Sequence, residues 1–220
     1  MPEATAKSAA SDDSTHPRGK YARSNDTRAR ILQAALTEAS ESGFQKTSVA
    51  QIAVRAGVAA GVVNYHFGSK GDLLRELMAS LTRELHSRLY LAIPAAGGNF
   101  FDHEHAGMLA YLDYLRANPS YLRLCEEVRW LEPELYRHAV EAWVEQFVKR
   151  VQDGINCGVM RPMSAQEISV QGHFLLGTHL FLDRLLQADP YPGDEAVADA
   201  YLGFLRNGLG STKTNPGQHP

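Results

Sequence analysis

The chain has 220 residues, of which 44% are hydrophobic and 21% are charged, and these values exclude wholesale disorder and a fibrous repeat. Its two cysteines, without CxxC spacing, exclude a disulfide framework and a zinc knuckle and fit a reducing compartment. The net charge of -3 conceals a division, because residues 16–75 hold nine Lys and Arg against four Asp and Glu, whereas residues 76–220 hold twelve against eighteen. A basic N-terminal part suits a polyanionic partner, although ordinary charge scatter explains the same numbers.

The first 23 residues are rich in Ala, Ser, Asp and Thr and lack periodicity, so we expect 1–23 to be a flexible tail. Its basic patch at Arg18, Lys20 and Arg23 fits a segment that follows DNA and equally a solvated tail without a role. No apolar core of a secretory signal occurs here, and the longest apolar run, near 174–182, is too short for a membrane span. We therefore expect no membrane contact and a cytoplasmic location.

A first helix is expected from Asp26, because apolar residues recur at helical spacing from Ile31 to Ala39. Gly43 supplies the left-handed residue that commonly ends a helix. Phe44 then follows as a core anchor.

Three more helices are expected directly after it. Ser48 and Gln51 match a capping box for the second helix, which Gly57 ends. The third is short, over 60–67, and the fourth begins at Ser69, whose side chain can cap it.

Later helices are expected at 102–117, 119–129, 133–156, 164–187 and 194–209, with Pro and Gly between them. No run sustains an alternation of period two. The predicted fold is therefore all-α, and we expect residues 211–220 to form a second flexible tail.

The residues from Ser48 to Phe67 have the spacing of a helix-turn-helix. Two short helices that cross near a right angle need a small residue at the contact, a residue tolerant of positive φ in the turn and a buried apolar residue on the second helix. Ala53, Gly57 and Val63 supply these in order. Such a crossing projects the second helix outward, where it suits the major groove of DNA.

Two strings surround this unit: residues 52–58 read IAVRAGV, and residues 61–70 read GVVNYHFGSK, with Asp72 and Leu73 after them. Together they resemble the signature of the tetracycline-repressor (TetR) family. The resemblance implies a three-helix DNA-binding domain, here 24–74, and a larger helical domain, here 75–210, which dimerises and binds a small effector. The close resemblance covers about the N-terminal quarter of the chain.

The resemblance also implies phosphate contacts to double-stranded DNA. Tyr65 and Lys70 match the family's contacts on either side of the recognition helix. Thr47 and Ser48 match further contacts at the start of the second helix, made through hydroxyl and backbone N–H groups.

Ala60, Gly61 and Asn64 occupy positions that face base edges in the family. Asn64 can pair with adenine through two hydrogen bonds. Ala59 departs from the pattern, because the family often has Ser or Thr there, so the usual side-chain cap of the third helix is missing.

The helix expected at 164–187 carries apolar residues on nearly every face, so it must be covered on all sides. Its own domain can cover one side, and a second chain is the natural cover for the other. Because the last two long helices form an intersubunit four-helix bundle in the family, the resemblance implies a homodimer through 164–209.

Aromatic and polar residues are mixed through the middle of the chain. Five aromatic residues, on three expected helices, are candidates for an effector pocket for a largely apolar small molecule: Tyr111, Tyr114, Trp143, Phe147 and Phe174. Each also fits an ordinary core position. The run from Asp102 to His105 holds metal-ligand types, but it has no matching pair elsewhere, so we favour a solvated helix start and expect no metal.

The leading hypothesis is a dimeric DNA-binding transcriptional regulator, a repressor that a small-molecule effector releases from its operator. The alternative is an effector-independent DNA-binding protein with an architectural or division-related role. An enzyme is disfavoured and no cofactor is expected, because we find no catalytic Ser, His and Asp or Cys and His arrangement, phosphate loop or paired carboxylates.

Overall fold

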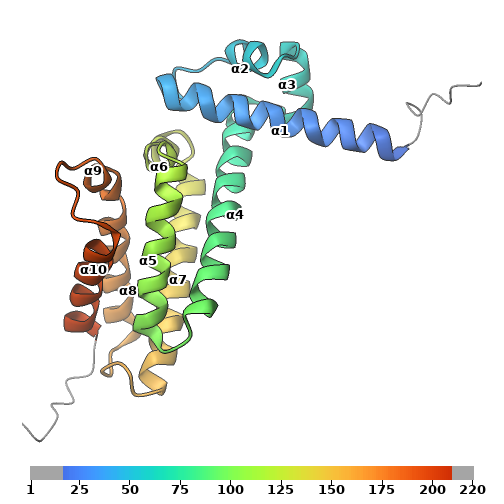
Figure 1. The fold of residues 1–220 in the computed structure, drawn as a ribbon. Helices are drawn as coiled ribbons and strands as arrows, with labels where there is room; N and C mark the ends of the chain where they lie inside the picture. Colours follow the sequence, from blue (N-terminus) through green and yellow to red (C-terminus); the bar gives the residue numbers. More distant parts are fainter. Residues whose placement is uncertain (1–16, 210–220) are drawn as a thin grey trace, which may run out of the picture.

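The computed structural model describes residues 17–209, and this range is all-helical, as predicted. Figure 1 shows two parts: a head, made of helices α1–α3 and the start of α4, and a body, made of the rest of α4 and helices α5–α10. The helices of the described range are α1 (Pro17–Ser42), α2 (Val49–Ala56), α3 (Ala60–Phe67), α4 (Lys70–Ala96), α5 (Phe100–Ala117), α6 (Tyr121–Leu131), α7 (Pro133–Asn156), α8 (Ala165–His179), α9 (Leu182–Leu186) and α10 (Asp194–Leu209).

Helix α1 begins earlier than Asp26, where the apolar pattern starts. Residues 17–23, expected to be part of a flexible tail, are its first turns. Proline at the first helical position has a φ that suits a helix, and the Arg, Lys and Ala residues after it favour helix without an apolar face. The remaining tail expectations, for 1–16 and 211–220, lie outside the described residues, as do the side chains of Arg18 and Lys20.

The head is built on the small-residue crossing that the sequence predicts. Ala53 and Val63 are both buried, and Gly57 has a φ of 65°, in the left-handed region that favours glycine. Its successor Val58 donates its N–H to the carbonyl of Ala53, which closes the end of α2. These residues turn the chain sharply between α2 and α3, and the buried side chain of Phe44 seals the core beneath them.

Helix α4 joins the head to the body (Figure 1). Ser69 caps it: its hydroxyl accepts the N–H of Asp72, whose carboxylate accepts the N–H of Ser69, so the capping box is complete. One face of α4 then stays buried along most of its length, through Leu73, Leu74, Leu77, Leu81 and Leu85. The same helix therefore contributes to the core of the head and to that of the body.

The helix expected at 164–187 is broken. Helix α8 ends at His179, and the chain turns before α9 begins at Leu182. Thr178 and His179 both donate to the carbonyl of Leu175, over 2.7 and 2.8 Å, and so compete with the N–H groups that would continue the helix. A continuous apolar pattern concealed this local competition.

The structure bears on two other expectations: a solvated helix start at 102–105, and the absence of a membrane-spanning helix. The stretch from Asp102 to His105 lies in the first turns of α5, where His105 Nε2 is 3.2 Å from Glu195 of α10. Between residues 17 and 209, no helix is long and apolar enough to cross a membrane.

Candidate nucleic-acid interface

Helix α3 presents one face to solvent and holds the other in the core. Of its eight residues, Val63 and Phe67 are buried. The positions expected to face base edges, Ala60, Gly61 and Asn64, are exposed. An exposed helix of this length, carried on a second short helix, has the form that enters a major groove.

Tyr65 is the most exposed large side chain of this face, with 84% of its surface accessible. Its ring packs edge-on against His66, with ring centroids 5.3 Å apart. The ring of Tyr65 thus has one internal contact, with the half-buried His66, and most of its surface faces solvent, where a phosphate can approach.

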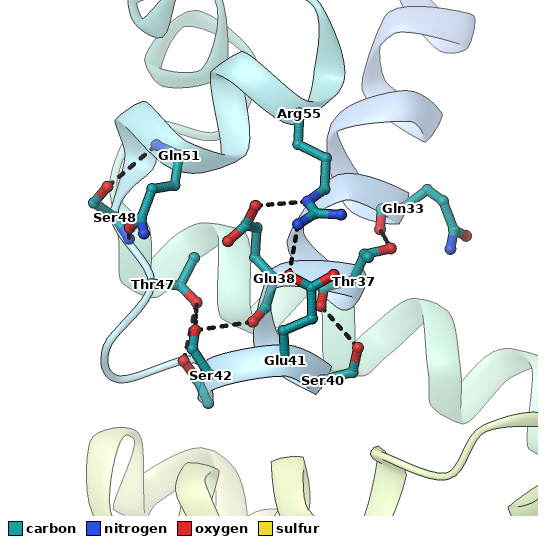
Figure 2. Close-up of polar contacts among 11 residues, drawn as sticks. Gln33, Thr37, Glu38, Ser40, Glu41, Ser42, Thr47, Ser48, Gln51 and Arg55 are labelled. Atoms are coloured by element: carbon teal, nitrogen blue, oxygen red, sulfur yellow. Dashed lines mark hydrogen bonds and ion pairs between the residues drawn. The ribbon is translucent and has the colours of Figure 1, made fainter.

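The structure corrects the expected role of Thr47. This side chain is 1% exposed, and its hydroxyl donates to the carbonyl of Gly43 over 2.9 Å. Figure 2 shows it beside Ser42, whose hydroxyl lies 3.4 Å away and donates in turn to the carbonyl of Glu38. A buried, paired hydroxyl does not contact a phosphate, so Thr47 stabilises the turn between α1 and α2.

Ser48 is exposed at the N-terminus of α2, where its hydroxyl accepts the N–H of Gln51 over 3.1 Å. The Gln51 side chain accepts the N–H of Ser48 over 2.8 Å, which confirms the capping box (Figure 2). The Ser48 hydroxyl keeps its own proton for an outside acceptor.

Lys70 is half-buried beside the same turn. Its ammonium donates to the carbonyl of Gln45 over 2.9 Å and lies 5.4 Å from the ring centroid of Phe44. An ammonium has three donors, so this bond leaves others for a phosphate. The bond to Gln45 thus holds the ammonium of Lys70, the expected phosphate contact, close to the head.

Arg55 fixes α2 against α1, a role that the helical pattern does not indicate. Its guanidinium contacts Glu38 and Glu41, each over 2.6 Å (Figure 2). The hydrogen bond to Glu38 is the main cause that raises the pKa of Arg55 above its ordinary value. The positive charge of Arg55 is therefore balanced within the head.

Helix α3 has no side-chain cap at its start. Ala59 adopts the extended backbone of a capping residue but makes no side-chain hydrogen bond there, as the sequence predicts. The first N–H groups of α3 therefore have no side-chain acceptor at Ala59, although its carbonyl accepts the N–H of Val62 over 2.9 Å.

Helix α6 of the body contacts the end of α1 and the turn between α1 and α2. Glu127 accepts the N–H of Gln45 over 2.8 Å, and Arg123 donates to the carbonyl of Ser40 over 3.3 Å. A Cβ added at Gly43 would lie 2.6 Å from Arg123 Nη2, so this approach requires glycine, which also has a φ of 87°. These contacts join the body to the segment that precedes Ser48.

A second joint lies at the start of α4. Arg75 contacts Glu132, between α6 and α7, over 2.5 Å, and Asp72 over 2.7 Å. Here too a glycine permits the approach, because a Cβ at Gly71 would lie 2.8 Å from Glu132 Oε1. We call these two sets of contacts the head-to-body joint.

Three of the five candidates for an effector pocket lie around one ring, and the other two do not. Tyr111 and Trp143 lie 5.4 and 6.0 Å from the ring of His179, and Phe147 stacks on Trp143 with centroids 5.5 Å apart. Tyr114 is fully buried elsewhere, and Phe174 is 68% exposed on the surface of α8. Helical spacing alone did not indicate which face of each helix turns inward.

The pattern did not indicate a buried carboxylate in the body. Glu104, which is 7% exposed, accepts from Arg150 over 2.5 Å and from the Tyr201 hydroxyl over 2.9 Å. The sequence did contain a sign of this burial, because the spacing places Glu104 on the same helical face as the buried Phe101 and Met108.

His179 lies beside this group, with its ring 5.6 Å from that of Tyr201 and 6.0 Å from that of Trp143. Burial lowers the pKa of His179 below its ordinary value, so the ring is neutral near pH 7. Because a carbonyl can only accept, Nδ1 carries the proton in its bond to Leu175, and Nε2 presents a lone pair.

The cysteines differ from each other. Cys125 lies against the core, where burial raises the pKa of its thiol to about 11, so the thiol is protonated. Cys157, in contrast, is exposed.

An outward-facing short helix, supported by a capped helix and a glycine turn, defines a class: the chain is a helix-turn-helix protein with an all-helical body. The comparisons agree with this class. Residues 31–77 match the model for bacterial regulatory proteins of the tetR family. By this match, the N-terminal segment of the chain resembles the DNA-binding segment of that family.

Two relatives are both named HTH-type transcriptional regulator BetI. The protein from Cronobacter sakazakii is 32% identical over 102 residues, which cover 40% of this chain and 50% of that protein. The protein from Burkholderia cenocepacia is 37% identical over 60 residues, covering 27% of this chain and 31% of the relative. The chain thus spans about half, or less, of the length of these relatives.

Solved structures resemble the fold over much more of the chain. A tetR family transcription regulator from Shewanella has a TM-score of 0.70 at 22% identity, covering 84% of this chain and 98% of the other. FadR from Bacillus subtilis, in complex with stearoyl-CoA, has a TM-score of 0.67 at 17% identity, covering 82% and 98%. At these identities the likeness establishes the shared helical fold.

Proposed function

We propose that this protein is a transcriptional regulator, not an enzyme, that binds double-stranded DNA in the cytoplasm through α3. The exposed face formed by Ala60, Gly61, Asn64 and Tyr65 carries this proposal. Asn64 reads a base edge, whereas Tyr65, Ser48 and Lys70 contact phosphates, so affinity and sequence choice come from different side chains. The match of residues 31–77 to the tetR family supports the same function.

The proposed regulator is a homodimer, and its interface lies on α8 and α10. Large apolar side chains stay exposed on this side of the single chain: Val170, Phe174, Phe181 and Phe204. Such a surface is typical of one that a partner covers. A two-fold axis through it would present two α3 helices to the two halves of a near-palindromic operator.

The proposed mode of action is repression relieved by a small, largely apolar effector in the body. The support is the group of Tyr111, Trp143 and Tyr201 around the neutral ring of His179, where aromatic surface and a free acceptor occur together. Coupling of about 1 to 3 kcal/mol between the two ligands changes operator affinity about 5- to 150-fold.

A DNA-binding protein without an effector is the second candidate. The full burial of Tyr114 and Phe147 among other side chains favours it, because filled space does not receive a ligand. The two candidates share the DNA-binding head and differ in the body.

DNA capture tests the proposed function. Genomic fragments retained by the full chain are sequenced, with the Asn64→Ala, Tyr65→Ala double variant as the control. We expect the wild type to enrich a near-palindromic sequence and the control to lose it. Equal retention of all fragments by both proteins would contradict the proposal.

Effector screening then separates the two candidates. Wild-type protein and Trp143→Phe are titrated with a library of apolar metabolites, with and without the recovered operator. A ligand that weakens operator binding must itself bind more weakly in the presence of operator, by the same factor. A library without any such ligand favours the second candidate.

A further inference from the structure

Helix α3 is held at its middle and at its end. Its start lacks a side-chain cap at Ala59, and of its two buried residues Val63 is the fourth of eight and Phe67 is the last. An eight-residue helix has little stability of its own, so its direction is set by its neighbours. Contacts near Phe67 therefore contribute to the angle at which α3 leaves the head.

Arg28 of α1 makes three contacts at that end. Its Nη1 donates to the carbonyl of His66 over 2.9 Å, and its Nη2 lies 2.9 Å from Glu76 Oε1 on α4. The guanidinium also lies over the ring of Phe67, 4.6 Å from its centroid. One side chain thus joins three helices: α1, α3 and α4.

The chemistry of these contacts suits arginine alone. The carbonyl of His66 is one of the last in α3 and lacks a partner within the helix, and a cation there also meets the negative end of the helix dipole. A guanidinium is planar, so it can stack on Phe67 while its two nitrogens point to different acceptors. A lysine has one charged nitrogen and cannot reproduce this fork.

We propose that Arg28 is a positioning residue that sets the angle of α3 on DNA and thereby the choice of operator sequence. It acts through His66 and Phe67, on the same helix as Asn64. Base-edge contacts require placement within roughly 0.5 Å and 10 to 20°, whereas flexible side chains such as Lys70 follow a phosphate over a wider range. Loss of Arg28 therefore reduces discrimination more than general affinity for DNA. This inference rests on the proposed function, because it concerns how α3 reads DNA.

The test compares Arg28→Lys with Arg30→Lys, which keeps the same charge on the same helix. Arg30 is exposed and lies 3.5 Å from Asp26, one turn away on α1. Dissociation constants are measured for the recovered operator and for unrelated duplex DNA. We expect Arg28→Lys to lower the ratio of the two constants about tenfold, the size of one lost base contact, and Arg30→Lys to leave it within about twofold.

Spectra of the free proteins provide a readout that needs no DNA. In amide NMR spectra, Arg28→Lys should shift the signals from Asn64 to Gly68, and Arg30→Lys should not. If Arg28→Lys does not fold, Glu76→Gln takes its place, since it removes one arm of the fork, and about a threefold loss of discrimination is expected.

An unchanged ratio in the folded variant, or an equal loss of affinity for both DNAs, would overturn the positioning role. Failure of the wild type to prefer any DNA sequence would overturn the proposed function instead. The shift of the α3 signals in the free variant is independent of that result, so the two failures are distinguishable.

Discussion

The contacts that stabilise the head differ in kind from those that stabilise the body. In the head, directed polar bonds connect neighbouring helices, as between Arg55 and Glu38 or between Arg28 and His66. In the body, broad apolar faces pack together, and the buried carboxylate of Glu104 links α5 to Arg150 of α7 and Tyr201 of α10. The head therefore depends on the geometry of single bonds, whereas the body depends on volume and on keeping its buried charge paired.

The largest effect is expected in the body, at its buried carboxylate. Glu104→Ala leaves Arg150 and the Tyr201 hydroxyl without their acceptor, so we expect a loss of about 2 to 3 kcal/mol in the free energy of unfolding. Urea unfolding of both proteins measures it. The exposed Glu141→Ala, which removes one surface ion pair with Arg137, should cost less than about 0.5 kcal/mol. Equal losses would show that Glu104 contributes no more to stability than a surface carboxylate does.

The next effect concerns the outer face of the body. Phe204 is 60% exposed, so Phe204→Glu should leave the single chain folded while placing a charge in the proposed dimer interface. We expect a monomer at micromolar concentration by analytical ultracentrifugation, with about 100-fold weaker operator binding, because one head replaces two. Tyr90→Glu, at another exposed aromatic residue, on α4, is the control and should remain dimeric. A dimeric Phe204→Glu protein would move the interface elsewhere.

Smaller effects are expected in the head. Asn64→Ala should reduce preference for the operator by about 1 to 3 kcal/mol with little change on unrelated DNA. Tyr65→Ala should weaken binding to all sequences and lower its dependence on salt concentration, since a phosphate contact is lost. Tyr65→Phe keeps the ring against His66 and isolates the hydroxyl. Binding measured on both DNAs at several salt concentrations separates these roles, and matching profiles for Asn64→Ala and Tyr65→Ala would contradict them.

The smallest effect is a pH dependence at the start of α4. Hydrogen bonds from the Ser69 side chain and then from Arg75 lower the pKa of Asp72 from 3.8 to about 2. Because the folded state favours the ionised form, the stabilisation is complete above about pH 4 and is lost as the pH falls towards 2. The difference in Tm between the wild type and Asp72→Asn should shrink over this window. A difference that stays constant from pH 6 to pH 2 would contradict the cap.

The sequence predicts the head well because the signals there are local. Ser48 with Gln51 and Ser69 with Asp72 are capping pairs three residues apart, and the bounds of α3 follow from Ala59 and Gly68. The phosphate contact that the family resemblance implied for Thr47 was wrong, since its burial depends on how the turn folds back on Gly43. Patterns among neighbouring residues predict where the helices begin and end. They do not predict which hydroxyl stays exposed to solvent.

In the body, contacts distant in sequence decide the outcome. Glu104 is paired with residues 46 and 97 positions away, and no short pattern contains such a pair. Phe174 looks the same in the sequence whether it faces a pocket or a second chain, and only its 68% exposure separates the two. The prediction of an all-helical body was confirmed, whereas only Tyr111, Trp143 and Phe147 of the five expected aromatic residues lie together, around His179.

The head-to-body joint affects the fraction of molecules that are able to bind an operator. Its bonds, such as those of Glu127 to Gln45 and of Arg75 to Glu132, hold the head in one orientation relative to the body, so a variant without them should adopt other orientations for part of the time. If two heads must fit one operator together, the fraction of competent molecules is the square of the fraction for one head. A change that loosens the joint would therefore weaken operator binding by twice its free-energy cost in one chain. The orientation of the head would in this way control the affinity of the pair more strongly than that of a single chain.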